Sequence, residues 1–397
     1  MSVGTAFHER TAPLNRKLQW REWSGYWAVS SYADHHDIEY NAIRSAAALI
    51  DVTPLYKYRI SGPDAQRFVD RVMIRDAAKL REGRVFYTCW CDEDGKVVDD
   101  GTVARLDETT YRWTAADPSF RWFTLNAGWL DVEIEDVSET VAAVALQGPA
   151  SRDVLERATG EPWGDLTYFG RRPSRIGDLE IDVSRTGYTG DLGYELWVEA
   201  GAAVELWDAL VAAGEPHGLR PAGMLALDVV RLEAGLILLE VDYTSSRAAE
   251  IPEQAYAPGE IGLGWMFDPG KATPYVGRRA LLAEHRKGGP PRRLVGLALG
   301  WDEIEAAYTK RGLPPAISPV TSRVPVPVTA RGRQVGRATS TGWSPILKRA
   351  IALASVEAAF ERPGTPVEVE WTVEARRGTV PARVVPLPFL DLERKRA

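Results

Sequence analysis

The sequence is poor in the residues that build metal centres and disulfide bonds. Its 397 residues include two cysteines, five histidines and four methionines. Cys89 and Cys91 lie two positions apart on one expected strand, too close for an easy structural disulfide and too few to ligate zinc without nearby histidines. We therefore expect two reduced, half-buried cysteines, no metal centre and a cytoplasmic protein.

Basic excess and long apolar runs are also missing. The formal net charge is −7, and the absence of a basic stripe or polybasic segment argues against nucleic acid and anionic membranes as partners. The sequence contains no apolar run of about 18 residues and no charged-then-apolar leader. A small-molecule ligand is the better expectation.

Tryptophan, in contrast, is abundant, with 14 residues. Trp20, Trp23 and Trp27 cluster early in the chain, and Trp90 and Trp113 lie further on. Aromatic walls suit flat heterocycles and cationic methyl groups, the latter through cation–π attraction of about 0.5–2 kcal/mol. Ordinary core filling is the alternative for any single tryptophan.

The stretch from Cys89 to Leu106 carries the strongest local signal. Asp94-Gly95 between two apolar runs predicts a hairpin, because a tight primed turn needs a positive φ that glycine supplies. Asp99 and Asp100 then lie mid-strand and point to opposite faces, so only one can enter a given pocket. The alternative is a solvated acidic pair beside a bulge at Gly101.

Two segments share one pattern of strand, Gly-Pro turn and helix. They are Ile60-Ser-Gly-Pro-Asp-Ala-Gln-Arg-Phe-Val-Asp-Arg-Val72 and Leu146-Gln-Gly-Pro-Ala-Ser-Arg-Asp-Val-Leu-Glu-Arg-Ala158. Proline is tolerated near a helix start because its missing N–H has no intrahelical partner there. The repeat predicts an α+β protein with pseudo-repeated subdomains.

The remaining periodicity completes a coarse map of the chain. Residues 1–15 are expected to form a loosely held arm, and apolar spacing predicts a helix over 34–50, with His35 and His36 in its first turn. Strands are expected at 56–60 and 110–115, helices at 118–130, 202–213 and 223–234, and connectors at 252–260 and 287–292. Short Val-rich runs with Gly and Pro turns over 293–390 predict a separate all-β barrel or sandwich.

A glycine-rich loop, Ser184-Arg-Thr-Gly-Tyr-Thr-Gly-Asp-Leu-Gly-Tyr-Glu-Leu-Trp197, follows the second repeat. Its glycines would let backbone approach a ligand closely. Glu195 opens the next apolar strand, where a carboxylate can accept two hydrogen bonds from an amino-pyrimidine edge.

Taken in order, these motifs resemble one family over about residues 20–390: the aminomethyltransferase (glycine-cleavage T-protein) family, with its folate-dependent demethylases and the folate domains of sarcosine and dimethylglycine oxidising enzymes. The matching pieces are Asp51-Val-Thr53, Gly95-Lys-Val-Val-Asp-Asp100, Leu146-Gln-Gly-Pro149, Arg185-Thr-Gly-Tyr-Thr-Gly190, Gly193-Tyr-Glu195, Arg231-Leu-Glu-Ala-Gly235, Gly262-Leu-Gly264, Gly277-Arg278, Ala338-Thr-Ser340, Ser344-Pro345 and the segment from Pro386 to Phe389.

The resemblance implies a three-domain cloverleaf around tetrahydrofolate. Its expected parts are a first α+β subdomain over 1–55 plus 140–250, a second over 56–139 plus 251–290, and a C-terminal β-barrel over 291–397. Asp100 matches the family's catalytic aspartate, and Glu195 matches the glutamate that holds the pterin ring. The other candidate cofactor-binding residues are Tyr87, Tyr168, Tyr188, Leu55, Trp113, Arg231 and Trp265.

Three departures separate the chain from T-proteins. Asp51-Val-Thr-Pro-Leu55 lacks the family's His-Met, Leu227 replaces a folate-contacting arginine, and Ala115 stands where an asparagine is usual. They favour the demethylase and sarcosine-oxidase branch. The leading hypothesis is a demethylase that moves a one-carbon group from an N-, O- or S-methyl donor to tetrahydrofolate.

Three alternatives stay open. They are a glycine-cleavage aminomethyltransferase working with a lipoyl carrier protein, a folate subunit served by a partner oxidase, and a non-catalytic iron–sulphur repair factor that binds folate. The repair relatives carry a cysteine in the motif that runs from Arg185 to Gly193, and this chain has none there.

Overall fold

The computed structural model describes residues 2–396. The described chain forms two compact units. The first comprises residues 2–88, 99–227 and 392–396, and the second comprises Cys89–Val98 and Asp228–Asp391. The boundaries of the three expected domains remain a prediction.

A six-stranded sheet of order β11-β12-β13-β10-β4-β14 forms one half of the first unit. Its strands are β4 (Ala48–Asp51), β10 (Val141–Gln147), β11 (Arg171–Ile176), β12 (Leu179–Ser184), β13 (Gly193–Glu199) and β14 (Arg220–Pro221). Tyr194 and Leu196 enter a hydrophobic core on one face. Because strand side chains alternate, Glu195 and Trp197 belong to the opposite face.

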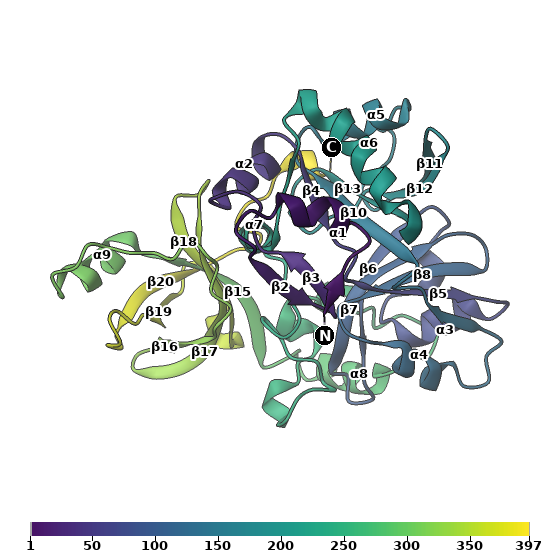
Figure 1. The fold of residues 1–397 in the computed structure, drawn as a ribbon. Helices are drawn as coiled ribbons and strands as arrows, with labels where there is room; N and C mark the ends of the chain where they lie inside the picture. Colours follow the sequence, from purple (N-terminus) through teal and green to yellow (C-terminus); the bar gives the residue numbers. More distant parts are fainter. Residues whose placement is uncertain (1, 397) are drawn as a thin grey trace. The chain divides into compact units, whose positions relative to one another are not determined.

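The helices α5 (Ser151–Thr159) and α6 (Ala203–Gly214) supply Val154, Leu206 and Leu210 to this core. Figure 1 shows both helices beside this sheet. The Glu195 face is therefore the one on which the sheet can present polar chemistry.

A five-stranded sheet of order β6-β7-β8-β5-β9 forms the other half of the first unit. Its strands are β5 (Tyr56–Ser61), β6 (Val85–Cys91), β7 (Val97–Arg105), β8 (Thr110–Ala115) and β9 (Glu133–Asp136). The tip of the β6–β7 hairpin, Cys89–Val98, groups with the second unit. The helices α3 (Ala65–Val72) and α4 (Phe120–Ala127) pack on this sheet, where the Phe123 ring lies 5.1 Å from Tyr58 and 4.8 Å from Trp113.

The predicted strand-turn-helix repeat is confirmed by its two turns. Gly62 (φ +126°) and Gly148 (φ +118°) occupy matching positions between β5 and α3 and between β10 and α5. A Cβ would lie 2.8 Å from the Asp131 carbonyl oxygen at the first turn and 2.7 Å from the Ala46 carbonyl oxygen at the second. Both turns therefore require glycine for conformation and for space.

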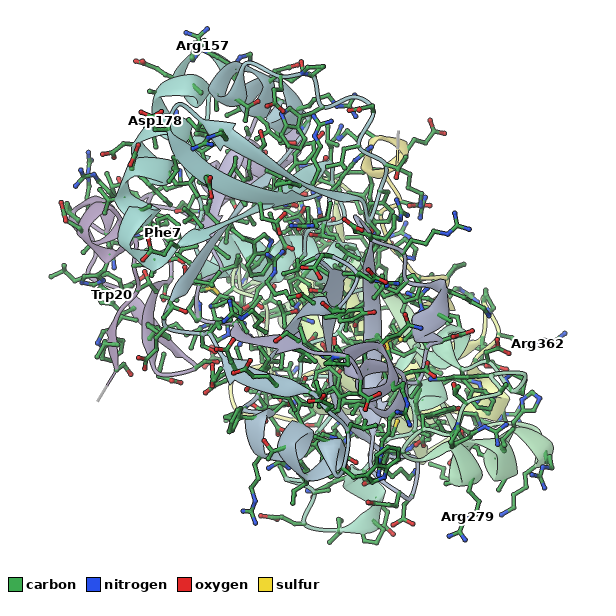
Figure 2. All side chains as sticks on the ribbon, turned by 90° about the vertical axis from the view of Figure 1, so that its right-hand side faces the viewer. Phe7, Trp20, Arg157, Asp178, Arg279 and Arg362 are labelled. Atoms are coloured by element: carbon green, nitrogen blue, oxygen red, sulfur yellow. The ribbon has the colours of Figure 1, made fainter. Side chains whose placement is uncertain are left out.

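The expectation of a loosely held arm over residues 1–15 is wrong. The segment forms β1 (Val3–Gly4) and α1 (His8–Thr11), and β1 joins β3 (Tyr26–Val29) and β2 (Trp20–Trp23) in a small sheet. Phe7, labelled in Figure 2, is fully buried in the core of the six-stranded sheet. Arg10 donates two hydrogen bonds of 2.8 Å to Asp208 on α6. The aromatic anchor, the ion pair and the pairing of β1 with β3 hold this segment in place.

The expected helix over 34–50 is too long. The structure has α2 only over Asp37–Ser45, and Ala48–Asp51 form the buried strand β4. The alanines at 46–48 suit both periodicities, and pairing of β4 with β10 decides for the strand. His35 and His36 precede the helix, and their rings stack at 5.0 Å.

In the second unit, the expected C-terminal barrel is confirmed as a closed six-stranded barrel of order β15-β18-β17-β16-β19-β20. Its strands are β15 (Arg292–Leu299), β16 (Val326–Ala330), β17 (Arg333–Ser344), β18 (Arg349–Glu357), β19 (Pro366–Glu370) and β20 (Thr379–Val385). The helix α9 (Trp301–Thr309), between β15 and β16, was not predicted. Its Ile304 is buried in the barrel core.

Two further helices complete the map: α7 (Met224–Glu233), which crosses the division between the units, and α8 (Arg278–Arg286). Within residues 2–396 no helix has the length and apolar character that a membrane span requires. The same residues contain no group of three or more His, Cys, Asp or Glu side chains placed to hold a metal ion. Cys89 and Cys91 are free thiols and are fully buried rather than half-buried.

Candidate active site

Asp100 lies on β7 with its carboxylate held by a tyrosine. The Tyr87 hydroxyl, on the neighbouring strand β6, donates a 2.7 Å hydrogen bond to Asp100 Oδ2. Asp100 is half-buried, so its carboxylate is both restrained and reachable. The structure thus brings together two of the residues that the sequence singled out.

The β7–β8 ladder is interrupted beside Asp100. The backbone N–H of Thr102 donates to the Thr114 hydroxyl at 2.9 Å, and backbone pairing is present from Val103 onward. A Cβ on Gly101 would lie 1.9 Å from the Thr114 carbonyl oxygen, so only glycine allows the two strands to approach here. Irregularities of this kind re-aim side chains next to functional sites.

Asp99, the neighbour of Asp100, is fully buried, so the alternative of a solvated acidic pair is wrong for this residue. One carboxylate oxygen accepts the backbone N–H of Asp100 at 2.7 Å, and the other accepts those of Ala116 and Asp117 at 3.0 Å each. Burial, with the negative charge of Asp100 adding to it, raises the pKa of the Asp99 carboxyl well above its usual range. The Asp99 side chain therefore extends the β7–β8 pairing beyond Ala115.

Glu195 lies at the start of β13, on the polar face of the six-stranded sheet. The Thr186 hydroxyl donates a hydrogen bond to Glu195 Oε2, and Ser184 and Thr186 share a hydrogen bond of 2.8 Å. Burial raises the pKa of the Glu195 carboxyl. A carboxylate held in this way is a strong acceptor for a ligand N–H.

The glycine-rich loop is packed around Gln147 at the end of β10. Gln147 Nε2 donates to the carbonyls of Thr186 and Tyr194 at 3.2 and 3.3 Å, and Gln147 Oε1 accepts the Thr189 hydroxyl at 2.7 Å. A Cβ on Gly187 or Gly193 would lie 2.1 or 2.4 Å from atoms of the Gln147 amide. These two glycines make room for a protein side chain, where the sequence suggested a close approach to a ligand.

Arg112 on β8 links the polar faces of the two sheets. Arg112 Nη1 donates to Asp182 on β12 at 2.6 Å, and its guanidinium carbon lies 4.1 Å from the centre of the Trp197 ring. Arg171 donates to the other oxygen of Asp182 at 2.6 Å. A groove of about 650 Å³ lies along this link. Arg112 was not predicted as a site residue, although its place between the apolar residues Tyr111 and Trp113 in a predicted strand was the available signal.

The Tyr168–Gly170 segment lies between the two sheets. The Val85 N–H, at the start of β6, donates to the Phe169 carbonyl at 2.9 Å, and the Arg185 N–H donates to the Gly170 carbonyl at 2.8 Å. Tyr168 is half-buried there. Tyr188 is half-buried within the glycine-rich loop. Tyr168 therefore lies on a segment that is hydrogen-bonded to β6, the strand of Tyr87. Tyr188 lies in the same loop as Thr186.

Lys57 on β5 holds the segment that contains Leu55. Its ammonium donates to the carbonyls of Thr53 at 2.6 Å and Leu55 at 2.8 Å, and the side chain is fully buried. Burial lowers the pKa of Lys57 to about 8. Leu55 is half-buried, so its side chain is available to a ligand while its backbone is fixed.

Three candidates stand apart from this description of the first unit's polar faces, one because it lies on another face and two because they belong to the second unit. Trp113 is fully buried against Phe123, on the face of β8 opposite Arg112. Arg231 and Trp265 belong to the second unit. Arg231 is fully buried there and donates to Asp242 at 2.7 Å and Ser340 at 2.9 Å. Trp265 is 62 % exposed.

The first unit is a mixed α+β structure with two sheets that each present a polar face, and the second unit contains a closed barrel. This combination defines the class of fold. A crystal structure of the glycine cleavage system aminomethyltransferase T from Bartonella henselae has the same fold, with a TM-score of 0.82, 24% identity and 98% of each chain covered. Residues 5–271 match the GCVT N-terminal domain, and residues 292–391 match the glycine cleavage T-protein C-terminal barrel domain. The chain belongs to the glycine-cleavage T-protein family.

Two relatives match all or nearly all of this chain. An aminomethyltransferase of Geobacillus thermodenitrificans is 36% identical over 92% of this chain and 93% of its own. Trimethylamine-oxide aldolase of Ruegeria pomeroyi is 34% identical over 100% of this chain and 48% of its own. The chain therefore spans about half the length of the aldolase and nearly all of the aminomethyltransferase.

Family membership confirms three expectations from the sequence: the resemblance, the α+β fold with a C-terminal barrel, and an enzyme of the one-carbon transferase class. The roles of the individual site residues stay predictions.

Proposed function

We propose that the chain binds tetrahydrofolate on the polar faces of the first unit and works as a demethylase, moving a one-carbon group from an N-, O- or S-methyl donor to the folate. The observation that carries the proposal is the restrained Asp100 carboxylate, held by Tyr87 at 2.7 Å. A second carboxylate, Glu195, stands on the other sheet.

The side chains of Glu195, Tyr168 and Tyr188 fit a pterin ligand. A pterin edge offers neighbouring N–H donors, and Glu195, oriented by the Thr186 hydroxyl, is an acceptor suited to them. Tyr168 and Tyr188 offer half-buried rings for a flat heterocycle or its aryl extension. Tetrahydrofolate, when bound, supplies the amine nitrogen that accepts the one-carbon group.

Asp100 has the geometry of a proton-handling group. Its Oδ2 is held by Tyr87, and its backbone N–H is held by Asp99 at 2.7 Å. A carboxylate fixed in this way can orient an amine and take up the proton that the amine loses as a carbon–nitrogen bond forms. Asp99 is then a positioning residue, because its own carboxylate is engaged by backbone donors.

A second candidate function is that of a folate subunit that accepts a one-carbon unit from a partner. Trimethylamine-oxide aldolase matches the whole chain with about half of its own length, so a separate protein could supply what the rest of that enzyme contains. Aminomethyl transfer from a lipoyl carrier is a third, supported by relatives named aminomethyltransferase.

Mass spectrometry of tetrahydrofolate distinguishes these functions. The purified protein is incubated with tetrahydrofolate and a panel of methylated amines, betaines, sulfonium compounds and aryl ethers. Formation of 5-methyltetrahydrofolate with one donor is the expected result. Formation of 5,10-methylenetetrahydrofolate only with a lipoyl carrier or an oxidase would overturn the demethylase in favour of the other two functions.

A further inference from the structure

A chain of buried side chains leads to the Glu195 carboxylate. Trp197 Nε1 donates to the Ser184 hydroxyl at 3.2 Å, and the hydroxyl oxygens of Ser184 and Thr186 are 2.8 Å apart. The Thr186 hydroxyl in turn donates to Glu195 Oε2. Ser184, Thr186 and Trp197 are 1, 5 and 4 % exposed, so their polar atoms depend on one another and not on water. We call Trp197, Ser184 and Thr186 the Trp197 relay.

Strand pairing places this relay on the polar face of the six-stranded sheet. Glu195 and Trp197 are two positions apart on β13 and therefore point to the same face. On β12, Ser184 lies directly opposite Glu195 in the register, so its side chain shares that face. The relay thus reaches Glu195 from within the sheet that carries it.

The direction of each hydrogen bond in the relay follows from the chemistry of its two ends. An indole N–H can only donate, and an ionised carboxylate can only accept. A hydroxyl has one proton, so Thr186, which gives its proton to Glu195, must accept a hydrogen bond from Ser184. The Ser184 oxygen then accepts the indole N–H. Every bond of the relay therefore points toward Glu195.

Protonation of Glu195 weakens the relay at either oxygen. A proton on Oε2 would donate to Thr186 and reverse the order, which leaves the Ser184 proton with the Glu195 carbonyl at 3.5 Å because an indole nitrogen cannot accept it. A proton on Oε1 would turn the charge-assisted bond from Thr186 into a weaker neutral one. The relay therefore favours the ionised carboxylate.

The charged groups beside the relay act in the same direction. The Arg112 guanidinium carbon lies 4.1 Å from the centre of the Trp197 ring, and Arg112 and Arg171 each donate to Asp182 at 2.6 Å. Burial raises the pKa of Glu195, and a hydrogen bond to its side chain and the charge of Arg112 oppose that rise. Ionisation of this carboxylate is thus held against the cost of its burial.

We propose that Trp197 is a positioning residue, which acts through Ser184 and Thr186 to keep Glu195 an ionised hydrogen-bond acceptor for the ligand. The inference rests on the proposed folate site, because an acceptor of pterin N–H groups is lost when it carries a proton. Thr186 engages Oε2, which leaves Oε1 of this half-buried residue for the ligand. The relay extends the pH range of ligand binding toward the acid side.

The titration of Glu195 in the free protein tests the relay directly. Carbon-13 NMR of labelled glutamate carboxyls follows this titration, and Glu195→Gln identifies the signal. Trp197→Phe removes the indole N–H and keeps an aromatic ring beside Arg112. We expect its midpoint to lie about half a pH unit above that of the wild type. In a Ser184→Ala background the same substitution should cause no further shift, because the connection to Thr186 is already broken.

Trp163→Phe is the matched control. Trp163 is fully buried in the core of the same sheet, its Nε1 donates to the Thr159 hydroxyl at 2.9 Å, and the Arg172 guanidinium carbon lies 4.0 Å from its ring centre. These contacts match those of Trp197, but the Thr159 hydroxyl donates to a backbone carbonyl within α5. The titration midpoint of Glu195 should therefore stay as in the wild type.

Calorimetric titration with 5-formyltetrahydrofolate from about pH 5 to 9 connects the relay to ligand binding. Below the midpoint, Trp197→Phe should bind the ligand about threefold more weakly than the wild type, because half a pH unit changes the ionised fraction by that factor. Well above the midpoint the two proteins should bind it alike. Trp163→Phe should follow the wild type at every pH.

The outcomes separate this inference from the proposed function. An unchanged midpoint in Trp197→Phe, or an equal shift in the Ser184→Ala background, overturns the relay and leaves the folate site standing. A loss of affinity that is the same at every pH also overturns it, because such a loss reports altered packing. A raised midpoint in a protein that binds no folate keeps the relay as a control of Glu195 and overturns the folate site.

Discussion

The carboxylate of Asp99 accepts the backbone N–H of Asp117 at 3.0 Å, a bond between β7 and the turn that follows β8. The same oxygen accepts the Ala116 N–H, and the other oxygen accepts the Asp100 N–H. One buried side chain therefore ties the backbone of the candidate catalytic residue to the next strand. Under the proposed function, Asp99 is the positioning residue and Asp100 the reacting residue.

Replacing Asp99 with asparagine tests this division. Both Asp99 oxygens accept N–H groups, whereas asparagine has a single oxygen, so its amide must face at least one donor. We expect turnover to fall by about 10- to 100-fold because Asp100 shifts, with tetrahydrofolate affinity changed by less than about twofold. Single-turnover kinetics and calorimetry measure the two effects.

Asp107→Asn is the matched control, because Asp107 accepts the Thr109 N–H at 2.9 Å in the turn between β7 and β8, away from Asp100. Its kinetics should match the wild type. If Asp99→Asn turns over as fast as this control, Asp99 has no positioning role.

Replacing Asp100 with asparagine should leave folate binding largely intact and reduce turnover strongly. Removing a positioned acid or base lowers rates by about 10²- to 10⁴-fold. Tyr87→Phe, which removes the 2.7 Å bond to Asp100, should cost less, because the carboxylate remains. Rate measurements on both variants with one donor show which variant loses more turnover. Unchanged turnover in Asp100→Asn would show that Asp100 has no catalytic role.

Glu195→Gln should weaken tetrahydrofolate binding and at the same time raise the stability of the folded protein. A charged hydrogen bond to a ligand is worth about 1.5–3 kcal/mol, so tetrahydrofolate should bind about 10- to 100-fold more weakly. Because burial raises the pKa of Glu195, its charge disfavours the folded state above that pKa. The variant should therefore unfold at a higher temperature than the wild type at pH 7.

The stability gain of Glu195→Gln should shrink as the pH falls and vanish below the unfolded-state pKa of about 4.3, where the carboxyl is neutral in both the folded and the unfolded chain. Thermal unfolding between pH 4.5 and 8 measures this dependence. A constant difference across that range would show that the Glu195 carboxylate is not destabilising.

Lys57→Met tests a pH dependence of stability with the opposite sign. Burial lowers the pKa of Lys57 to about 8 in the folded protein, below the unfolded value of about 10.4. Between these two values the unfolded chain holds more protons, so wild-type stability relative to the variant rises with pH, by at most about 3 kcal/mol. Urea unfolding of both proteins from pH 7.5 to 10.5 gives the difference, and a flat difference contradicts the lowered pKa.

Local patterns predicted the elements that dominate the site. The β6–β7 hairpin and the position of the two acids in β7 followed from turn chemistry and strand alternation, and β8 matched its expected bounds of 110–115. The expected primed turn at Asp94-Gly95 is wrong: the turn runs from Asp92 to Gly95, and of its residues only Gly95 has a positive φ (+72°). The burial of Asp99 could not be predicted from these patterns, because the N–H groups that it accepts belong to Ala116 and Asp117, which follow another strand. Periodicity carries no information about such long-range backbone pairing.

The same limit explains the N-terminal segment and Arg112. Phe7 is buried by α6 and the six-stranded sheet. The helix α6 and all strands of this sheet except β4 lie more than a hundred residues away in sequence. Arg112 was read only as a strand residue, and its role depends on Asp182 and Trp197 from the other sheet. In each case a single side chain is assigned by tertiary contacts and not by its own segment.

The glycines of the loop give the last test, because they separate packing from ligand approach. In Gly193→Ala the new Cβ would lie 2.4 Å from the Gln147 amide, so we expect a loss of about 1–3 kcal/mol of stability from overpacking. Gln147→Ala alone leaves the Thr186 and Tyr194 carbonyls without their bonds to its amide. The double variant should be more stable than the sum of the two changes predicts, because the smaller side chain removes the clash. Urea unfolding of the four proteins gives this coupling. Strict additivity would mean that Gly193 serves the ligand and not Gln147.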